Sequence, residues 1–438
     1  MLRSAIAIVI FAALFLPLAH KLPYYPRPLE WLIASAYDKY DLAPSIHWPR
    51  LLTSAGGHFD VLLALASKYP FFLDDVFETP PGKKYTVENS DWMKRQFFEG
   101  WYFKVVRRLV VPTHADRLRD GGTSTLVVIP GVLFDGGAGD PHAFIMVAGV
   151  GEATYHKFPL ADVHLATLPD DGFELRIGQN NFSATAIELA IPGVAEGWLE
   201  LVDSTPYPVT PLSPTVMGWF AYLDALVPMQ CSHGVVQLTA AARGELRLGG
   251  DAPVHVDGAR AYVEKDWGWS FPQRWVWLQT NEFAGSPRSS FMLSVASIPW
   301  PNAETTLFSF TGFLGFLYDG PNQKLHRFGT YTGATVEFLC DDGAVGCGFG
   351  SPALAGGERV RLRLRDAQYI LDVSARGDRK RAAQLWGPKP VATGLRMEKF
   401  VDEMLGAVEI DVALTRRSDG KAVFKSTGRD GGLEIQVE

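Results

Sequence analysis

Glu264 and Asp266 lie at the start of a stretch, EKDWGWSFPQRWVWLQTNEF (264–283), that also contains four tryptophans. If this stretch begins as a β-strand, side chains two positions apart share a face, which places Tyr262, Glu264 and Asp266 together. Two carboxyl groups this close repel each other when both are ionised, so one of them keeps its proton to a higher pH. Both acids are therefore candidates for a proton donor.

The second half of the same stretch predicts the wall of a binding pocket. In RWVWLQTNEF the alternation puts Trp275, Trp277, Gln279 and Asn281 on one face and leaves a plain core face opposite. Large rings combined with amide groups are typical of a pocket that takes a mostly apolar ligand with a polar head. The alternative is that these tryptophans are ordinary core residues of a sheet.

A third candidate acid lies in the segment QFFEGWYFKV. Alternation places Glu99 on the same face as Phe97, Trp101 and Phe103, where the loss of water raises a carboxyl pKa. The alternative for each of the three acids is a structural ion pair with a buried cation. The cations available for such a pair are Lys104, Lys265 and Arg274.

A neutral carboxylic acid that is sheltered from water can protonate an electron-rich alkene. The resulting carbocation is stabilised by indole rings through cation–π attraction, and a nearby hydroxyl group can trap it. This chemistry needs no cofactor, and the chain contains no GxGxxG, P-loop, HExxH, GxSxG or CxxC motif. The ten histidines are scattered without metal-ligand spacing, so we expect neither a cofactor nor a metal.

The elements that must position these side chains are strands. Beyond the N-terminal region the sequence alternates, or is β-branched and apolar, with Gly, Pro and Asp turns between the segments. In RVRLRLR, for example, Val360, Leu362 and Leu364 face one way and the arginines the other. We expect an all-β protein with two antiparallel barrel or sandwich units, one at 91–258 and one at 259–438.

The N-terminal region has a different character. Residues 5–19 form an apolar run behind Arg3, of the length of a signal-peptide core and short for a full membrane span. We expect residues 1–20 to be a signal-anchor that keeps the protein at a membrane, or a signal peptide that is cleaved on export. Residues 21–90 combine many prolines with apolar residues at helical spacing, which predicts a helical lead-in.

Charge and cysteine content exclude two further classes. A net charge of −7, without a basic run interleaved with aromatic residues, argues against nucleic acid as the partner. Three cysteines are too few for a disulfide framework. Cys340 and Cys347 could still bridge a short loop in an oxidising compartment, and Cys231 is expected to be a buried apolar residue.

Three blocks of the sequence resemble the tocopherol cyclase family. They are FFEGWYFKV (97–105), GWFAYLDALVPMQCSHGVV (218–236) and YVEKDWGWSFPQRWVWLQTNEF (262–283), in the same order and at similar spacing. The resemblance implies two lipocalin-like β-barrels. It also implies cofactor-free cyclisation of a prenylated hydroquinone to a chromanol, an isomerase (intramolecular lyase) reaction of vitamin E biosynthesis.

Matching the chain to the family pattern narrows the roles. Glu99, Glu264 or Asp266 would be the proton donor, and the plant cyclases read EKNWGGGFP where this chain reads EKDWGWSFP, which favours the two glutamates over Asp266. His233, in SHGVV, is the candidate base for the phenol proton. The candidate substrate-binding residues are Trp101, Tyr102, Trp267, Trp275, Trp277, Gln279 and Asn281.

Two other functions stay open at this point. A lipocalin-like binder or carrier of isoprenoid ligands would do no chemistry, and its carboxyl groups would be structural. A hydratase of isoprenoid alkenes, similar to carotenoid hydratases, would add water, whereas cyclisation leaves the mass unchanged. The expected partners of the cyclase are a prenylated quinol and a membrane, contacted through the N-terminal segment.

Overall fold

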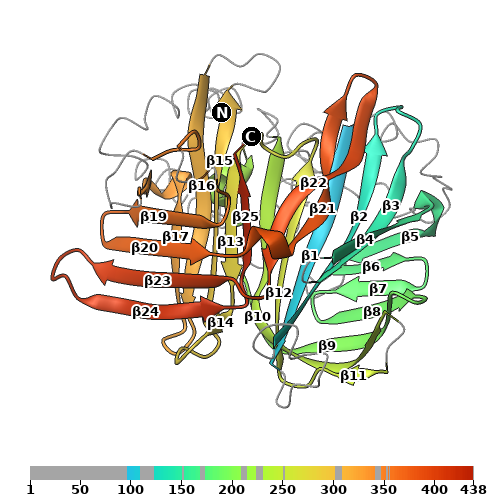
Figure 1. Cartoon of the computed structure of the whole chain (residues 1–438), viewed down its shortest axis with the longest axis horizontal. Helices are drawn as coiled ribbons and strands as arrows, with labels where there is room; N and C mark the ends of the chain where they lie inside the picture. Colours follow the sequence, from blue (N-terminus) through green and yellow to red (C-terminus); the bar gives the residue numbers. More distant parts are fainter. Residues whose placement is uncertain are drawn as a thin grey trace, which may run out of the picture.

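The computed structural model describes residues 96–108, 123–149, 152–167, 173–208, 215–222, 230–249, 252–300, 308–340, 347–351, 354 and 356–437. Over these residues the protein is built from antiparallel strands in three sheets, so the prediction of an all-β protein is confirmed (Figure 1). Short 3-10 helices join some of the strands: η5 (Leu160–Asp162), η6 (Gly218–Tyr222), η7 (Thr330–Thr332) and η8 (Arg379–Arg381). The predicted signal segment and helical lead-in lie outside the described residues. Within the described part, no helix has the length and apolar character needed to cross a membrane.

The first sheet has twelve strands, in the order β4-β3-β2-β1-β12-β10-β9-β8-β7-β6-β5, with β11 paired to β10. Its strands are β1 (Gln96–Arg108), β2 (Thr123–Asp135), β3 (His142–Gly149), β4 (Glu152–Phe158), β5 (Val163–Thr167), β6 (Phe173–Ile177), β7 (Asn180–Ser183), β8 (Ala186–Ile191), β9 (Ala195–Pro206), β10 (Cys231–Leu248), β11 (Val254–His255) and β12 (Ala259–Gly268).

This sheet curls around an apolar core of its own. Strand β1 lies in the middle of the sheet and β6 and β7 lie near one end, yet their rings touch: Trp101 stacks on Phe173 with centroids 5.7 Å apart, and Phe103 meets Phe182 at 5.8 Å. Only a curled sheet brings such distant strands together, and Figure 1 shows β6 to β9 running across β1 to β3. We call the enclosed side the inner face of the twelve-stranded sheet.

Two smaller sheets make up the rest of the described chain. The seven-stranded sheet has the order β17-β16-β15-β13-β25-β22-β21, and the six-stranded sheet has the order β14-β24-β23-β20-β19-β18. Their strands are β13 (Trp275–Thr280), β14 (Glu282–Phe283), β15 (Ser290–Trp300), β16 (Phe308–Asp319), β17 (Lys324–Gly329), β18 (Thr335–Phe338), β19 (Arg359–Arg365), β20 (Tyr369–Arg376), β21 (Ala382–Val391), β22 (Gly394–Leu405), β23 (Glu409–Arg416), β24 (Ala422–Arg429) and β25 (Gly432–Gln436).

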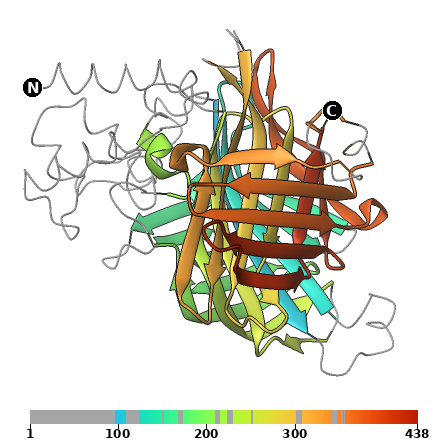
Figure 2. The ribbon, with the colours of Figure 1, turned by 90° about the vertical axis from the view of Figure 1, so that its left-hand side faces the viewer.

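The six- and seven-stranded sheets pack face to face around a second core, with their strands crossing at a steep angle (Figure 2). Val360, Leu362 and Leu364 of β19 are buried in this core as the alternation predicted, and the arginines between them point outward. A disulfide joins Cys340 to Cys347, the pairing anticipated from their spacing.

The seven-stranded sheet is covered on both faces. Every residue of β13 is buried, because Val276 and Leu278 face the six-stranded sheet while Trp275 and Trp277 face the twelve-stranded sheet. The side chains between the twelve- and seven-stranded sheets form a third core, to which both sheets contribute. Strand β12, residues 259–268, pairs with β1 and β10, so the change from the first unit to the second falls after Gly268 in the sheet pairing. The division of the whole chain into residues 1–20, 21–90, 91–258 and 259–438 stays a prediction.

Candidate active site

The pairing of β1 with β12 decides which predicted residues can meet. Glu99 lies opposite Trp267, Trp101 opposite Lys265 and Tyr102 opposite Glu264. Directly paired residues share a face of the sheet, and the next pair along lies on the other face. The predicted residues therefore divide into two groups on opposite faces of the twelve-stranded sheet.

The group on the inner face centres on a buried ion pair between Glu99 and Lys265, whose side chains are 0% and 1% exposed. The Lys265 ammonium lies 4.7 Å from the centroid of the Trp101 ring and 5.1 Å from that of Trp267, in cation–π contact with both. Burial raises the pKa of Glu99, and the ammonium group of Lys265 works against that rise. Glu99 thus has the arrangement of a structural ion pair, the alternative considered for each of the three acids.

The second group lies between the twelve- and seven-stranded sheets. On the side of the twelve-stranded sheet, His233 of β10 lies opposite Asp266 of β12. Its Nδ1 is 2.6 Å from Asp266 Oδ1 and its Nε2 is 3.1 Å from Glu264 Oε2, while the Tyr262 hydroxyl donates a hydrogen bond to Glu264 Oε2 at 2.6 Å. The Asp266 side chain is 30% exposed and that of Glu264 is 3% exposed, so this row of groups runs from the surface inward.

The charge of His233 follows from its two partners. Burial alone lowers the pKa of the imidazole, but the carboxylates of Asp266 and Glu264 outweigh it and raise that pKa well above its ordinary value. At neutral pH both ring nitrogens therefore carry protons and donate to the two carboxylates. The prediction that His233 is the base therefore requires the imidazole first to lose a proton.

The pH dependence of stability tests the charge of His233. Because the folded protein holds this proton above the unfolded pKa of about 6.5, the stabilisation is complete below that pH and is lost as the pH rises through the folded-state pKa. We expect the free energy of unfolding to fall by up to about 1.4 kcal/mol per pH unit more steeply in the wild type than in His233→Gln over this window. Urea titrations at a series of pH values measure how steeply the free energy of unfolding changes with pH in both proteins. Equal slopes would contradict a protonated His233 between the two carboxylates.

His233, Glu264 and Asp266 are also the side chains that could hold a metal ion in the described part of the chain. One ligand atom from each lies within 4.8 Å of the others. A metal would have to displace the protons between the imidazole and the two carboxylates, since each ring nitrogen already faces an oxygen. The expectation of no metal stays a prediction.

Two further acids, which are not among the candidates proposed from sequence, face this group from the seven-stranded sheet. Glu403 of β22 and Glu434 of β25 lie directly opposite each other in the strand pairing. The Tyr102 hydroxyl donates to Glu403 Oε1 at 2.5 Å across the gap between the sheets, and the Trp275 indole donates to Glu434 Oε2 at 2.6 Å. In LEIQ, Glu434 alternates with core residues and looks like a solvent-facing residue, because the sequence does not show that this sheet is covered on both faces.

These two acids have unusual electrostatics. Glu403 is fully buried, and burial raises its pKa to about 7, against the opposing effects of the Tyr102 hydrogen bond and the Lys104 ammonium. Glu434 is half-buried, and burial together with the charge of Glu403 raises its pKa well above the ordinary value. Burial lowers the pKa of Lys104 to about 8. The site therefore contains carboxyl groups that keep protons near neutral pH.

The predicted pocket wall on β13 is present here as well. Trp277 packs edge-on against Tyr102 with centroids 5.3 Å apart. Gln279 accepts a hydrogen bond from Lys104 at 2.9 Å, and Asn281 donates one to the carbonyl oxygen of Ala261 at 2.8 Å, so both amides bridge the two sheets. Within the described residues, four buried polar atoms of this region have no hydrogen-bond partner, as expected where a ligand's polar groups would bind. They are Trp277 Nε1, Gln279 Nε2, Asn281 Oδ1 and Glu403 Oε2.

We call this set of residues the inter-sheet site. It consists of Tyr102, Lys104, His233, Tyr262, Glu264, Asp266, Trp275, Trp277, Gln279, Asn281, Glu403 and Glu434. Three of the residues proposed from sequence are not part of this site. Glu99, Trp101 and Trp267 lie on the inner face of the twelve-stranded sheet, and the sheet itself separates them from the inter-sheet site.

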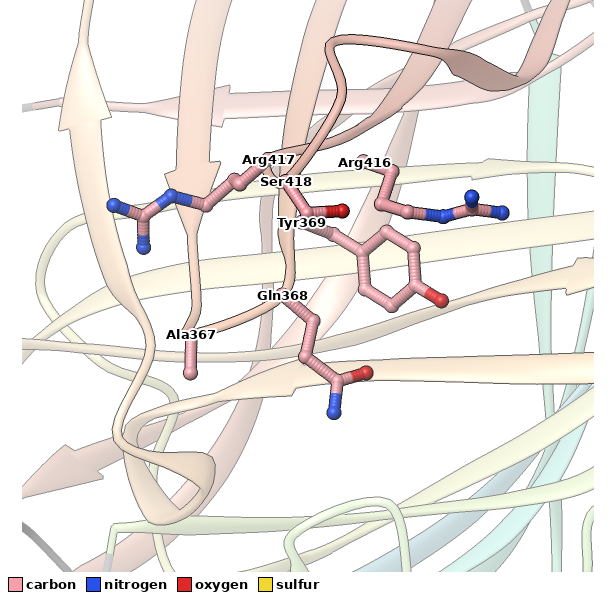
Figure 3. Close-up of a pocket in the computed structure, with 6 residues that line it drawn as sticks. All are labelled: Ala367, Gln368, Tyr369, Arg416, Arg417 and Ser418. Atoms are coloured by element: carbon pink, nitrogen blue, oxygen red, sulfur yellow. The ribbon is translucent and has the colours of Figure 1, made fainter.

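A surface pocket of about 560 Å³ lies elsewhere, at the ends of β20 and β23 (Figure 3). It is lined by Ala367, Gln368, Tyr369, Arg416, Arg417 and Ser418. Arg416 pairs with Asp419 at 3.0 Å, and Arg417 donates to the carbonyl oxygen of Asp366 at 2.6 Å, so both guanidinium groups already have partners. The lining offers neither a carboxyl group nor an indole ring, and the six-stranded sheet contributes no residue to the inter-sheet site.

Known proteins similar to this chain agree with the resemblance of its three sequence blocks. A probable chloroplastic tocopherol cyclase of Oryza sativa subsp. japonica is 24% identical over 282 residues, which is 56% of this chain and 58% of the rice protein. The match thus spans less than two thirds of that relative.

Two solved structures align with most of this chain at low identity. The crystal structure of CghA with Sch210972 has a TM-score of 0.49 and 13% identity, and covers 83% of this chain and 97% of that one. A putative AttH from Nitrosomonas europaea has a TM-score of 0.34 and 12% identity, and covers 82% of this chain and 99% of that one.

The family assignment is based on the sequence. The model of the tocopherol cyclase-like family matches residues 209–436, which include β10, β12 and all strands of the two smaller sheets. The matched region contains every residue of the inter-sheet site except Tyr102 and Lys104. Because it makes up more than half of the chain, this protein belongs to the tocopherol cyclase-like family.

Proposed function

We propose that this protein is a cofactor-independent cyclase that converts a prenylated hydroquinone to a chromanol in the inter-sheet site. The observation that carries the proposal is the meeting, between two sheets, of sheltered carboxyl groups with indole rings and unpaired polar atoms. Acid, cation-stabilising rings and headgroup ligands are the three requirements of this reaction. Membership in the tocopherol cyclase-like family supports the same activity.

The substrate binds with its aromatic head at the polar end of the site. The free amide atoms of Gln279 and Asn281 and the Lys104 ammonium would receive the hydroxyl groups of the hydroquinone. The prenyl chain then lies along the faces of Trp275 and Trp277. The predicted N-terminal anchor would bring this site to the bilayer in which such a lipid is dissolved.

The reaction is a balanced isomerisation. A carboxyl O–H bond breaks and a C–H bond forms at the alkene, which leaves a tertiary carbocation beside the indole rings. The phenol oxygen forms a C–O bond to the cation, and its proton passes to the carboxylate of Glu264. Tyr262 and His233 hold that carboxylate in place through hydrogen bonds to Oε2. No oxidant, reductant or added water is needed.

Isotope labelling of the product tests this function. The purified protein, incubated with a prenylated hydroquinone in deuterium oxide, should give a chromanol with one carbon-bound deuterium and otherwise the mass of the substrate. In water labelled with heavy oxygen, no label should enter the product. Heavy oxygen in the product would identify a hydratase, and binding without turnover across a series of prenylated quinols would identify a carrier; either result would reject the cyclase.

A further inference from the structure

We propose that Glu403 and Glu434 form a carboxyl dyad that retains one proton and donates it to the substrate alkene. This assignment rests on the proposed function and names the acid of the same site. Neither residue was among the candidates derived from the sequence.

The first support is the position of the two side chains. Glu403 and Glu434 are directly paired on the neighbouring strands β22 and β25, and both project toward the twelve-stranded sheet. Side chains opposed in this way have Cβ atoms about 4.5–5.5 Å apart. Two carboxyl groups so close, in a place from which water is largely excluded, are not both ionised at once, so the pair retains a proton.

The second support is the set of hydrogen bonds around the dyad. Tyr102 donates to Oε1 of Glu403, and Trp275 donates to Oε2 of Glu434, so one oxygen of each carboxyl group is fixed as an acceptor. Glu403 Oε2 is buried and has no partner among the described residues. A proton on that oxygen is not held by a protein acceptor, and it is therefore available to an alkene π bond.

The third support is the surrounding charge. Burial raises the pKa values of both acids, to about 7 for Glu403, and the charge of Glu403 adds to the rise at Glu434. The carboxylate of Glu264 raises both further, whereas the Lys104 ammonium opposes the rise at Glu403. The dyad therefore keeps a proton at neutral pH and remains acidic enough to release it.

The other acids lie on another face or have other partners. Glu99 lies on the far face of the sheet, where Oε1 pairs with Lys265 and the buried Oε2 has no partner among the described residues, and Glu264 and Asp266 accept hydrogen bonds from His233. The inter-sheet site thus has a donor on the seven-stranded sheet and an acceptor, Glu264, on the twelve-stranded sheet, with the substrate between them. Glu434 is half-buried, and it can exchange protons with solvent when the product leaves.

Glutamine and aspartate variants of the two acids test the proposal. Glu403→Gln and Glu434→Gln should each lower kcat by about 10²–10⁴-fold, the usual range for loss of a general acid, with KM changed much less. Glu403→Asp and Glu434→Asp retain a carboxyl group and should turn over at least about tenfold faster than the corresponding glutamine variants. The matched control is Glu398→Gln on the same strand β22, because that exposed side chain pairs with Lys389 at 2.9 Å outside the site. Circular dichroism shows which variants are folded.

Infrared spectroscopy gives a reading that does not need turnover. The difference spectrum between wild type and either glutamine variant at neutral pH should contain the carbonyl band of a protonated carboxyl group, whereas Glu398→Gln should remove only carboxylate bands. Two results would overturn the dyad: carboxylate bands alone for Glu403 and Glu434, or turnover at the wild-type rate in both glutamine variants. In either case, formation of chromanol by the wild type would still uphold the cyclase. If the wild type forms no chromanol, the donor role falls with the proposed function, even if the infrared band shows a retained proton.

Discussion

Replacing Glu264 by glutamine is expected to lower kcat for ring closure by about 10²–10⁴-fold. The carboxylate accepts hydrogen bonds from both His233 and Tyr262, and it faces the acids of the seven-stranded sheet across the site. Glutamine has the same shape and can still accept from the tyrosine, but it cannot take a proton from the phenol. The phenol proton then loses the acceptor assigned to it, so the attack of the phenol oxygen on the cation slows.

The measurement is kcat and KM for a prenylated hydroquinone with the purified variant. KM should change little, because the amides of Gln279 and Asn281 and the tryptophan rings are untouched. Glu409→Gln is the matched control, since that side chain lies on β23 and pairs with Arg376 at the surface. A Glu264→Gln protein that is folded and keeps the wild-type kcat would remove Glu264 from the reaction.

Replacing Glu99 by glutamine is expected to lower the free energy of unfolding by about 3–5 kcal/mol. The Glu99–Lys265 pair is buried against Trp101 and Trp267, so the variant leaves the Lys265 ammonium in the core without this carboxylate. The cost of an uncompensated buried charge is much larger than that of breaking an exposed ion pair, which is about 0–1 kcal/mol.

Urea unfolding of the single and double variants measures this effect. Adding Lys265→Met to Glu99→Gln removes the charge and should recover a large part of the lost stability, because an apolar pair often replaces a buried ion pair at little cost. Arg376→Gln at the exposed Arg376–Glu409 pair should change stability by less than about 1 kcal/mol. A loss of this small size for Glu99→Gln would show that the inner ion pair is not a major support of the sheet.

Much of the fold was predictable because alternation is a local property. The burial of Val360, Leu362 and Leu364, and the common face of Tyr262, Glu264 and Asp266, both follow from the period of two in a strand. The wall formed by the β13 tryptophans and amides follows for the same reason. The disulfide between Cys340 and Cys347 could be anticipated because the two residues are close in sequence.

The candidate site was only partly predictable because it depends on contacts between distant segments. The sequence shows that Glu99 and Glu264 both lie on strands, but only the register of β1 against β12 shows that they occupy opposite faces. Glu403 and Glu434 lie in segments that read as half-exposed strands. Their burial arises because a second sheet covers the first, and no residue pattern within either strand records that packing.

The most direct test of the central claim is a crystal structure with a substrate analogue whose side chain is saturated and therefore cannot react. The inter-sheet site predicts that the analogue lies between the twelve- and seven-stranded sheets, with its aromatic head near Gln279 and its side chain passing Trp277 and the carboxyl groups of Glu403 and Glu434. An analogue bound instead on the inner face of the twelve-stranded sheet, against Trp101 and Glu99, would contradict this account.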